Sequence, residues 1–164
     1  MAHSARVAHQ VNRVSDLLDG AWRSAVADAA WLHDIGYSPQ VMSTGFHPLD
    51  GARWLRDRGW PMATCRLVAW HTSAWAEGVL RGLDHELAAE FEPPPELAAN
   101  VLAWADLTSS PAGEEWTVGH RLRDMLRRYP ADSIEHRAIA DAAPALRRAA
   151  RDIESRLGLR TARR

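Results

Sequence analysis

Six side chains in this sequence are of types that bind metal ions, and helical periodicity or a helix end places each of them toward the interior. They are His3, His33, Asp34, His47, His71 and Asp106. A buried imidazole or carboxylate is costly unless it has a partner. One or two divalent cations would satisfy all six groups together, and such ligands suit Mn, Fe, Co, Ni or Zn. The pattern therefore predicts a metal site inside a helical protein.

The inward direction of these residues follows from their spacing to apolar residues, because positions four apart share one face of a helix. His3 lies four residues before Val7, and Asp106 lies four residues after Leu102. The segment AAWLHDIGYSP (residues 29–39) carries a His–Asp pair at the end of an apolar run.

Each histidine taken singly has another explanation, since one inward histidine is more often a hydrogen-bonded core residue than a ligand. Four histidines and two aspartates in one small core would each need a separate partner, so the set favours metal binding. The remaining histidines fall on a polar face or out of phase with their helices, and we expect them in solvent. They are His9, His85, His120 and His136.

Apolar spacing is helical almost throughout the chain, and no sustained alternation indicates strands. The fold class predicted is all-α, a single-domain helical bundle. Gly, Ser, Pro and Thr interrupt residues 36–46, which we expect to form a loop beside the site. We expect helices over residues 3–20, 22–34, 47–59, 61–71, 83–91, 96–107, 117–129 and 134–157.

Composition narrows the classes of function. The chain has 164 residues and a net charge of −1, which gives no sign of a nucleic-acid or membrane surface. Cys65 is the only cysteine, so we expect no intrachain disulfide and a cytoplasmic location. All 20 basic residues are arginine, which excludes lysine nucleophiles and P-loop lysines. We expect one domain over residues 1–158 and an arginine-rich tail over 159–164.

Five segments occur in a recognisable order and together resemble the HD-domain metal-dependent phosphohydrolases. They are HSARVA (3–8), LHDIGYSP (32–39), TGFHPLDGARWL (44–55), LVAWH (67–71) and WADLTSSPAG (104–113). The resemblance implies a helical bundle of the HD-domain type with a His, His–Asp, Asp ligand set at His3, His33, Asp34 and Asp106. His47 and His71 occupy the positions of the two extra histidines in the two-metal members of the family.

The resemblance implies one or two divalent ions (Mn, Fe, Co, Ni, Zn or Mg) and hydrolysis of a phosphate ester or anhydride. The substrate expected is a small phosphorylated metabolite, first of all a nucleotide. Asp34 is the predicted catalytic bridge between the first metal and a second metal held by His47 and His71. Water activated by metal would attack phosphorus in line.

Further roles at the site fall on a few other residues. Phosphate needs a cationic partner, which in this chain must be arginine, and Arg6 is the first candidate and Arg53 the second. An ordinary surface position explains either one equally well. Asp50 is a candidate general acid or orienting group, although a cap or a local pairing is the stronger interpretation. Thr72 and Ser73 directly follow His71, and we expect them to line the pocket.

Two other classes of function stay open. Similar six-ligand bundles also support di-iron oxygenase chemistry, and a non-catalytic domain would bind a nucleotide or a partner protein. The complete ligand set argues against the non-catalytic class. We expect a small-molecule substrate, and the sequence leaves room for a homodimer.

Overall fold

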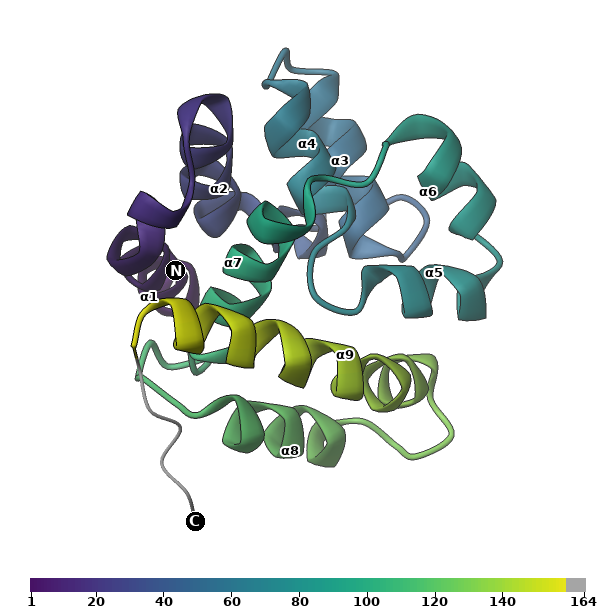
Figure 1. The fold of residues 1–164 in the computed structure, drawn as a ribbon. Coiled ribbons are helices and arrows are strands. Elements are labelled where there is room, and N and C mark those ends of the chain that lie inside the picture. The colour runs from purple at the N-terminus through teal and green to yellow at the C-terminus, as the bar shows by residue number, and fades with distance from the viewer. Residues whose placement is uncertain (159–164) are drawn as a thin grey trace.

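The computed structural model describes residues 1–158, in which nine α-helices and two short 3₁₀ helices follow one another (Figure 1). The arginine-rich tail expected at 159–164 lies outside the described residues. The α-helices are α1 (Ala2–Val14), α2 (Gly20–Leu32), α3 (His47–Arg56), α4 (Met62–Ala69), α5 (Ala74–Arg81), α6 (Asp84–Glu90), α7 (Glu96–Leu107), α8 (Val118–Arg128) and α9 (Ile134–Arg156). The 3₁₀ helices are η1 (Ser15–Leu17) and η2 (Ile35–Tyr37). The predicted all-α class is confirmed.

Helix α7 runs through the middle of the molecule. Its sequence is apolar on nearly every face, which is typical of a helix surrounded by others. Every residue from Val101 to Ser110 is buried, and α7 packs against α1, α2, α4, α8 and α9. The last turn of this central helix therefore carries Asp106 to the interior.

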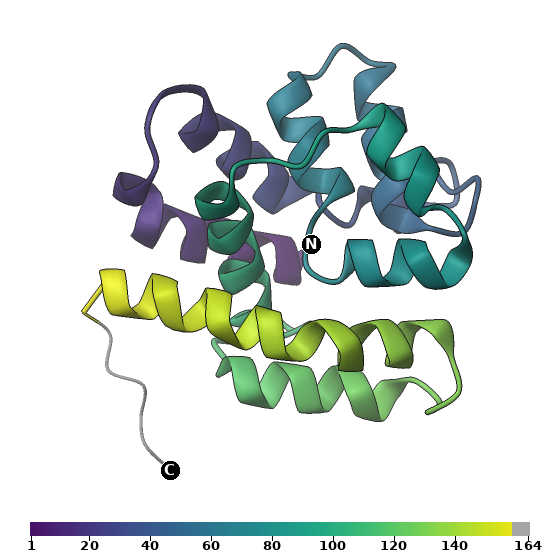
Figure 2. The same ribbon diagram turned by 45° about the vertical axis from the view of Figure 1, so that its right-hand side comes forward.

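The other helices cover α7 from two sides (Figures 1 and 2). Helices α1 and α2 pack together and α3 packs on α4, and these two pairs meet where α2 contacts α4. On the opposite side α8 and α9 form a hairpin, and α5 lies along α9. The site described below lies where these two halves face each other.

Helix α5 is the element that the periodicity did not predict. It spans only eight residues and contains Gly78, which weakens a helix in isolation. The glycine allows the ring of Phe46 to approach, since an added Cβ would lie 3.5 Å from that ring. Packing against α9 and Phe46 therefore stabilises a helix that local sequence alone would not.

A close approach between η2 and α3 sets the position of the His–Asp segment. A Cβ on Gly36 would overlap the backbone oxygen of His47, so only glycine fits there. Gly51 faces the same contact, and a Cβ there would lie 3.1 Å from the side chain of Ile35. These two glycines bring Asp34 and His47 to neighbouring places.

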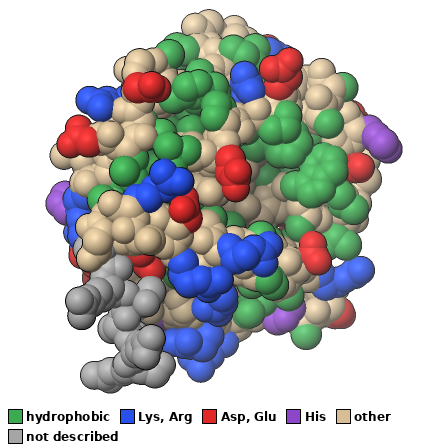
Figure 3. Space-filling view, in the orientation of Figure 1, with side chains coloured by type: hydrophobic (Ala, Val, Ile, Leu, Met, Phe, Trp, Pro, Cys, Tyr) green, Lys and Arg blue, Asp and Glu red, His purple; other side chains and the backbone are tan. Residues whose placement is uncertain are grey.

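The face drawn in Figure 3 mixes acidic, basic and apolar side chains. Arginine side chains gather in its lower half, where Figure 1 shows α8 and α9. Among residues 1–158, no helix has both the length and the apolar composition needed to cross a bilayer.

Candidate metal centre

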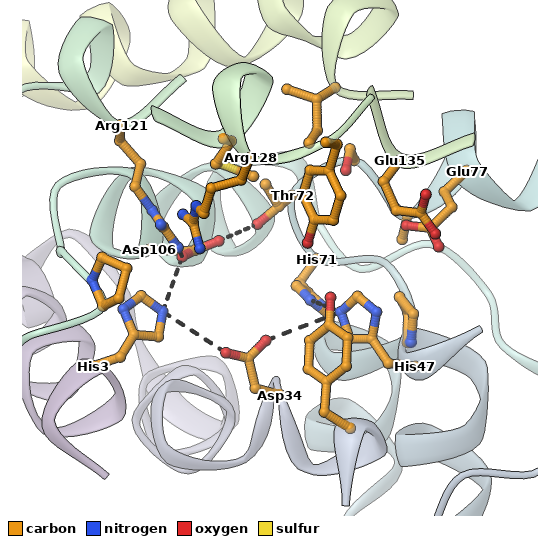
Figure 4. A pocket seen from close by; sticks show the side chains of 18 residues that line it. His3, Asp34, His47, His71, Thr72, Glu77, Asp106, Arg121, Arg128 and Glu135 are labelled. Atoms are coloured by element: carbon orange, nitrogen blue, oxygen red, sulfur yellow. Dashed lines mark hydrogen bonds and ion pairs between the residues drawn. The ribbon is translucent and has the colours of Figure 1, made fainter. Parts of the chain in front are cut away.

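Five of the six predicted ligands line one cavity of about 250 Å³ between the two halves of the molecule (Figure 4), and the sixth, His33, is buried beside Asp34. Helix ends and turns supply them. His3 comes from the start of α1, His33 and Asp34 from the end of α2, and His47 from the start of α3. His71 follows α4, and Asp106 lies in the last turn of α7.

The ligand atoms form two groups of three, and within each group they lie within 4.8 Å of one another. The first group contains His3, His33 and Asp106, and the second contains Asp34, His47 and His71. Nε2 of His3 lies 3.1 Å from Oδ1 of Asp106, and the Nε2 atoms of His47 and His71 are 3.1 Å apart.

Asp34 stands between the two groups. Its Oδ2 lies 3.3 Å from Nε2 of His33 and 3.8 Å from Nε2 of His3. Its Oδ1 faces the other way, 3.9 Å from Nε2 of His47. The side chain is 39% exposed, while His33 beside it is 1% exposed. A carboxylate in this position has the geometry of a bridge that also reaches solvent.

Backbone carbonyl groups orient three of the four imidazoles. Nδ1 of His3 donates to the carbonyl of Ser110 (3.2 Å), Nδ1 of His33 to that of Ala30 (3.2 Å) and Nδ1 of His71 to that of Val68 (2.6 Å). With Nδ1 carrying the proton, each neutral ring presents the lone pair of Nε2 to the cavity. Metal-binding histidines are held in this way by their second nitrogen.

The charges in the centre perturb several pKa values. Burial lowers the pKa of His33, but the carboxylates of Asp34 and Asp106 outweigh burial and raise it to about 9. Burial and the charge of His33 hold the pKa of His71 below its usual value, and burial with His71 lowers that of His47.

Both carboxylates are held in the charged form. Burial alone would raise the pKa of Asp34 and of Asp106, yet His33 lowers the first, and His3 together with His33 lowers the second. Metal ligands must be deprotonated, so the charged carboxylates and the lowered pKa values of His47 and His71 favour a cation, which would have to displace the proton of His33.

The donor set fits one or two divalent cations. Nε2 of His3 and Nε2 of His33 are buried and have no hydrogen-bond partner among the described residues. A buried polar atom without a partner is costly, and a cation between these two nitrogens and the carboxylates of Asp34 and Asp106 would supply the partner. Imidazole and carboxylate are ligands that first-row divalent ions accept.

Thr72 supports this arrangement from the turn after His71. Its Oγ1 donates a hydrogen bond of 2.6 Å to Oδ2 of Asp106, while Oδ1 of the same carboxylate faces His3. Thr72 has φ +49°, a left-handed conformation that is rare for a β-branched residue. Thr72 and Ser73 line the cavity as expected, but the bond to Asp106 could not be predicted from the sequence.

Asp50 does not line the cavity. It is buried in the first turn of α3, where its carboxylate accepts hydrogen bonds from the backbone N–H groups of Ser43, Thr44 and Gly45. The hydroxyl of Thr44 also donates to it. Asp50 therefore pairs locally with the loop before α3 and does not cap this helix, and the general-acid interpretation has no geometric support.

Neither predicted phosphate-binding arginine reaches the cavity. Arg6 donates from Nη2 to Glu115 at 3.1 Å. Arg53 pairs with Glu86 and Glu90 on α6. Both guanidinium groups are engaged with carboxylates elsewhere, so the cation for a phosphate must come from other residues.

Two arginines from α8, Arg121 and Arg128, line the cavity instead (Figure 4). Neither was predicted from the sequence, because both lie on an arginine-rich helix with no local signal that separates an inward arginine from an exposed one. The only indication was that Arg121 directly precedes the apolar Leu122, which the structure buries.

The remaining histidines stay outside the site. His9, His85 and His120 are exposed, as predicted. His136 differs, because it is half-buried and its Nδ1 lies within hydrogen-bond distance of the carbonyls of Leu126 and Tyr129. It links the start of α9 to the end of α8, a role for which helical phase contained no signal.

Comparison with known families agrees with this geometry. The family model described as HD domain matches residues 1–110 of the chain. The chain belongs to the HD domain family. HD domains bind divalent metals, and most members of the family are metal-dependent hydrolases. Neither the curated proteins nor the solved structures contain a significant match.

The HD-domain match contains all six candidate ligands and ends at Ser110. Helices α8 and α9 lie beyond it, although they pack against α7 and α5 and form one wall of the cavity. The wall facing the metal centre therefore belongs to this chain's C-terminal part and not to the matched region.

Proposed function

We propose that this HD-domain protein is a metal-dependent phosphohydrolase that cleaves a phosphate ester or anhydride of a small metabolite. The observation that carries the proposal is the pair of ligand groups with Asp34 between them. In two-metal hydrolases a pair of cations stabilises the attacking and leaving oxygens of the displaced phosphoryl group, and the two ligand groups would hold such a pair.

Each of the candidate ligands would have a defined role in holding the metal ions. His3, His33 and Asp106 hold one side of the centre, His47 and His71 hold the other, and Asp34 spans both. Divalent cations bound there would lower the pKa of a water molecule and neutralise charge on the phosphoryl oxygens. Asp34 is the only one of the six with substantial exposure, so it lies at the place where water and substrate enter.

A nucleotide is the first substrate class to test. The cavity of about 250 Å³ suits a compact phosphorylated molecule. Tyr37 stacks on His47 with ring centroids 3.9 Å apart and lines the same cavity, which offers an aromatic surface beside the metal centre. A nucleobase would find stacking there, and a sugar phosphate would not need it.

The decisive experiment begins with elemental analysis of the purified protein. A phosphate-release screen over nucleotides and sugar phosphates then follows with Mn²⁺, Co²⁺, Zn²⁺ and Mg²⁺. We expect bound metal and turnover of at least one substrate. His33→Ala and Asp34→Ala should abolish turnover, whereas His9→Ala, which changes an exposed histidine on α1, should leave it unchanged.

Other outcomes assign the other classes. Oxygen consumption after anaerobic loading with iron, together with a mixed-valent signal and no phosphate release, would replace the hydrolase by a di-iron oxygenase. A protein that holds no metal and hydrolyses nothing with any added cation would be a non-catalytic binding domain.

A further inference from the structure

Arg121 is the buried cation nearest the candidate metal centre, and its environment does not satisfy it. The residue is 8% exposed, and its Nε and Nη1 atoms have no hydrogen-bond partner among the described residues. Nη2 lies 3.7 Å from Oδ1 of Asp106, and Nη1 lies 3.7 Å from Oδ2 of Asp124. Both distances are too long for hydrogen bonds.

A buried guanidinium without hydrogen bonds is expensive to maintain. The usual resolution of such a cost is a ligand that accepts the free N–H groups. The guanidinium donates in a planar fork that matches two oxygens of a phosphate. Arg121 lines the cavity beside Asp106, so an anion in the cavity would meet this guanidinium (Figure 4).

The distribution of charge along the cavity favours an anion at the end that Arg121 lines. At the opposite end Glu77 and Glu135 line the wall, and Arg81 is bound to both carboxylates. The positive charge of Arg81 at that end is therefore already neutralised by the two glutamates. Arg128 stands next to Arg121 and adds positive charge, although it also donates to Asp124 at 2.6 Å.

We propose that Arg121 is the phosphate-binding residue of this site, supplied by α8 from outside the region that matches the HD family. The phosphoryl group would lie between the metal centre and the guanidinium, with an oxygen accepting from Nη2, the nitrogen nearest Asp106. This inference rests on the proposed function for the identity of the anion. Arg121 takes the role that the sequence suggested for Arg6 and Arg53, whose guanidinium groups are bound to glutamates.

The test measures binding of inorganic phosphate by calorimetry to the protein as purified with its metal. Arg121→Gln should weaken phosphate binding by about tenfold to a hundredfold, the range for losing hydrogen bonds to a charged group. Arg121→Lys keeps the charge without the fork and should fall between. The matched control is Arg127→Gln, which removes an exposed arginine from the same helix and should bind phosphate as the wild type does.

Binding does not require turnover, so the result is separate from the proposed activity. Phosphate binding that is lost in Arg121→Gln supports the inference even if no substrate is hydrolysed. Equal phosphate affinity in wild type and Arg121→Gln, or no phosphate binding by the wild type, overturns it. If Arg121→Gln does not fold by circular dichroism, the comparison of Arg121→Lys with wild type decides, and unchanged affinity there overturns it equally.

Discussion

Thr72 and Asp106 are joined by a hydrogen bond of 2.6 Å, although 34 residues separate them in the sequence. The bond holds one oxygen of a buried carboxylate and leaves the other for the metal centre. It also explains why a threonine occupies a left-handed turn, because that conformation aims its hydroxyl at the end of α7. Strained backbone that positions a functional group is a common feature of active sites.

Thr72→Val should weaken metal binding by about tenfold, since partners that orient metal ligands contribute about 10- to 100-fold in affinity. Valine keeps the shape and the backbone strain of threonine but lacks the hydroxyl. Thr72→Ser, which keeps the hydroxyl, should bind metal nearly as the wild type does. Competition with a chromophoric chelator measures both. Equal affinities for the Val and Ser variants would contradict the positioning role.

The two ligand groups predict that the protein binds two metal ions and that each ion depends on the residues of its own group. Asp106→Asn should lose the ion of the His3 group, and His71→Ala should lose that of the His47 group. Asp34→Asn should reduce both because its oxygens face both groups. Elemental analysis after dialysis gives the stoichiometry. A wild type with one equivalent that both single variants abolish would show a one-metal site.

The metal-free protein should lose stability as the pH rises from 6.5 to 9. The pKa of His33 is raised from 6.5 to about 9, so the stabilisation from its protonated form is complete below pH 6.5 and disappears as the pH passes 9. The change amounts to roughly 3 kcal/mol of unfolding free energy. The lowered pKa values of His47 and His71 act below pH 6.5, outside this window.

Urea unfolding at pH 6.5, 8 and 9 tests this effect with and without chelator. Metal displaces the proton from His33, so the metal-loaded protein should not show the same loss. The unfolding free energy of the His33→Gln variant without metal should stay constant from pH 6.5 to 9. A loss of equal size in His33→Gln would assign the pH dependence to another group.

Gly36→Ala should disturb both stability and the metal centre. The added Cβ would overlap the His47 carbonyl, so η2 and α3 must move apart. Overpacking of this kind costs about 1–3 kcal/mol, and the shift separates Asp34 from His47. Gly119→Ala is the control, because its Cβ would make only ordinary contacts at 3.5 Å, with two arginine side chains. Thermal unfolding and metal content measure the two effects.

Helical periodicity was sufficient to predict most of the elements. Of the nine α-helices in residues 1–158, seven match the ranges expected from apolar spacing within three residues at each end, and the first, α1, ends at Val14, six residues before the expected end at Gly20. The remaining helix, α5, depends on contacts with α9 and Phe46 that a local pattern does not contain. Helix α9 was predicted despite Pro144, and the structure keeps it continuous.

The sequence by itself predicted the inward direction of the six candidate ligands, because the phase of a helix depends only on the spacing of nearby residues. Only the tertiary structure decided which of them meet and what surrounds them. It directed the carboxylate of Asp50 to the backbone of the preceding loop, paired Arg6 and Arg53 with distant glutamates, and brought Arg121 to the cavity. Those outcomes depend on how helices far apart in the chain pack together, which phase along a single helix does not encode.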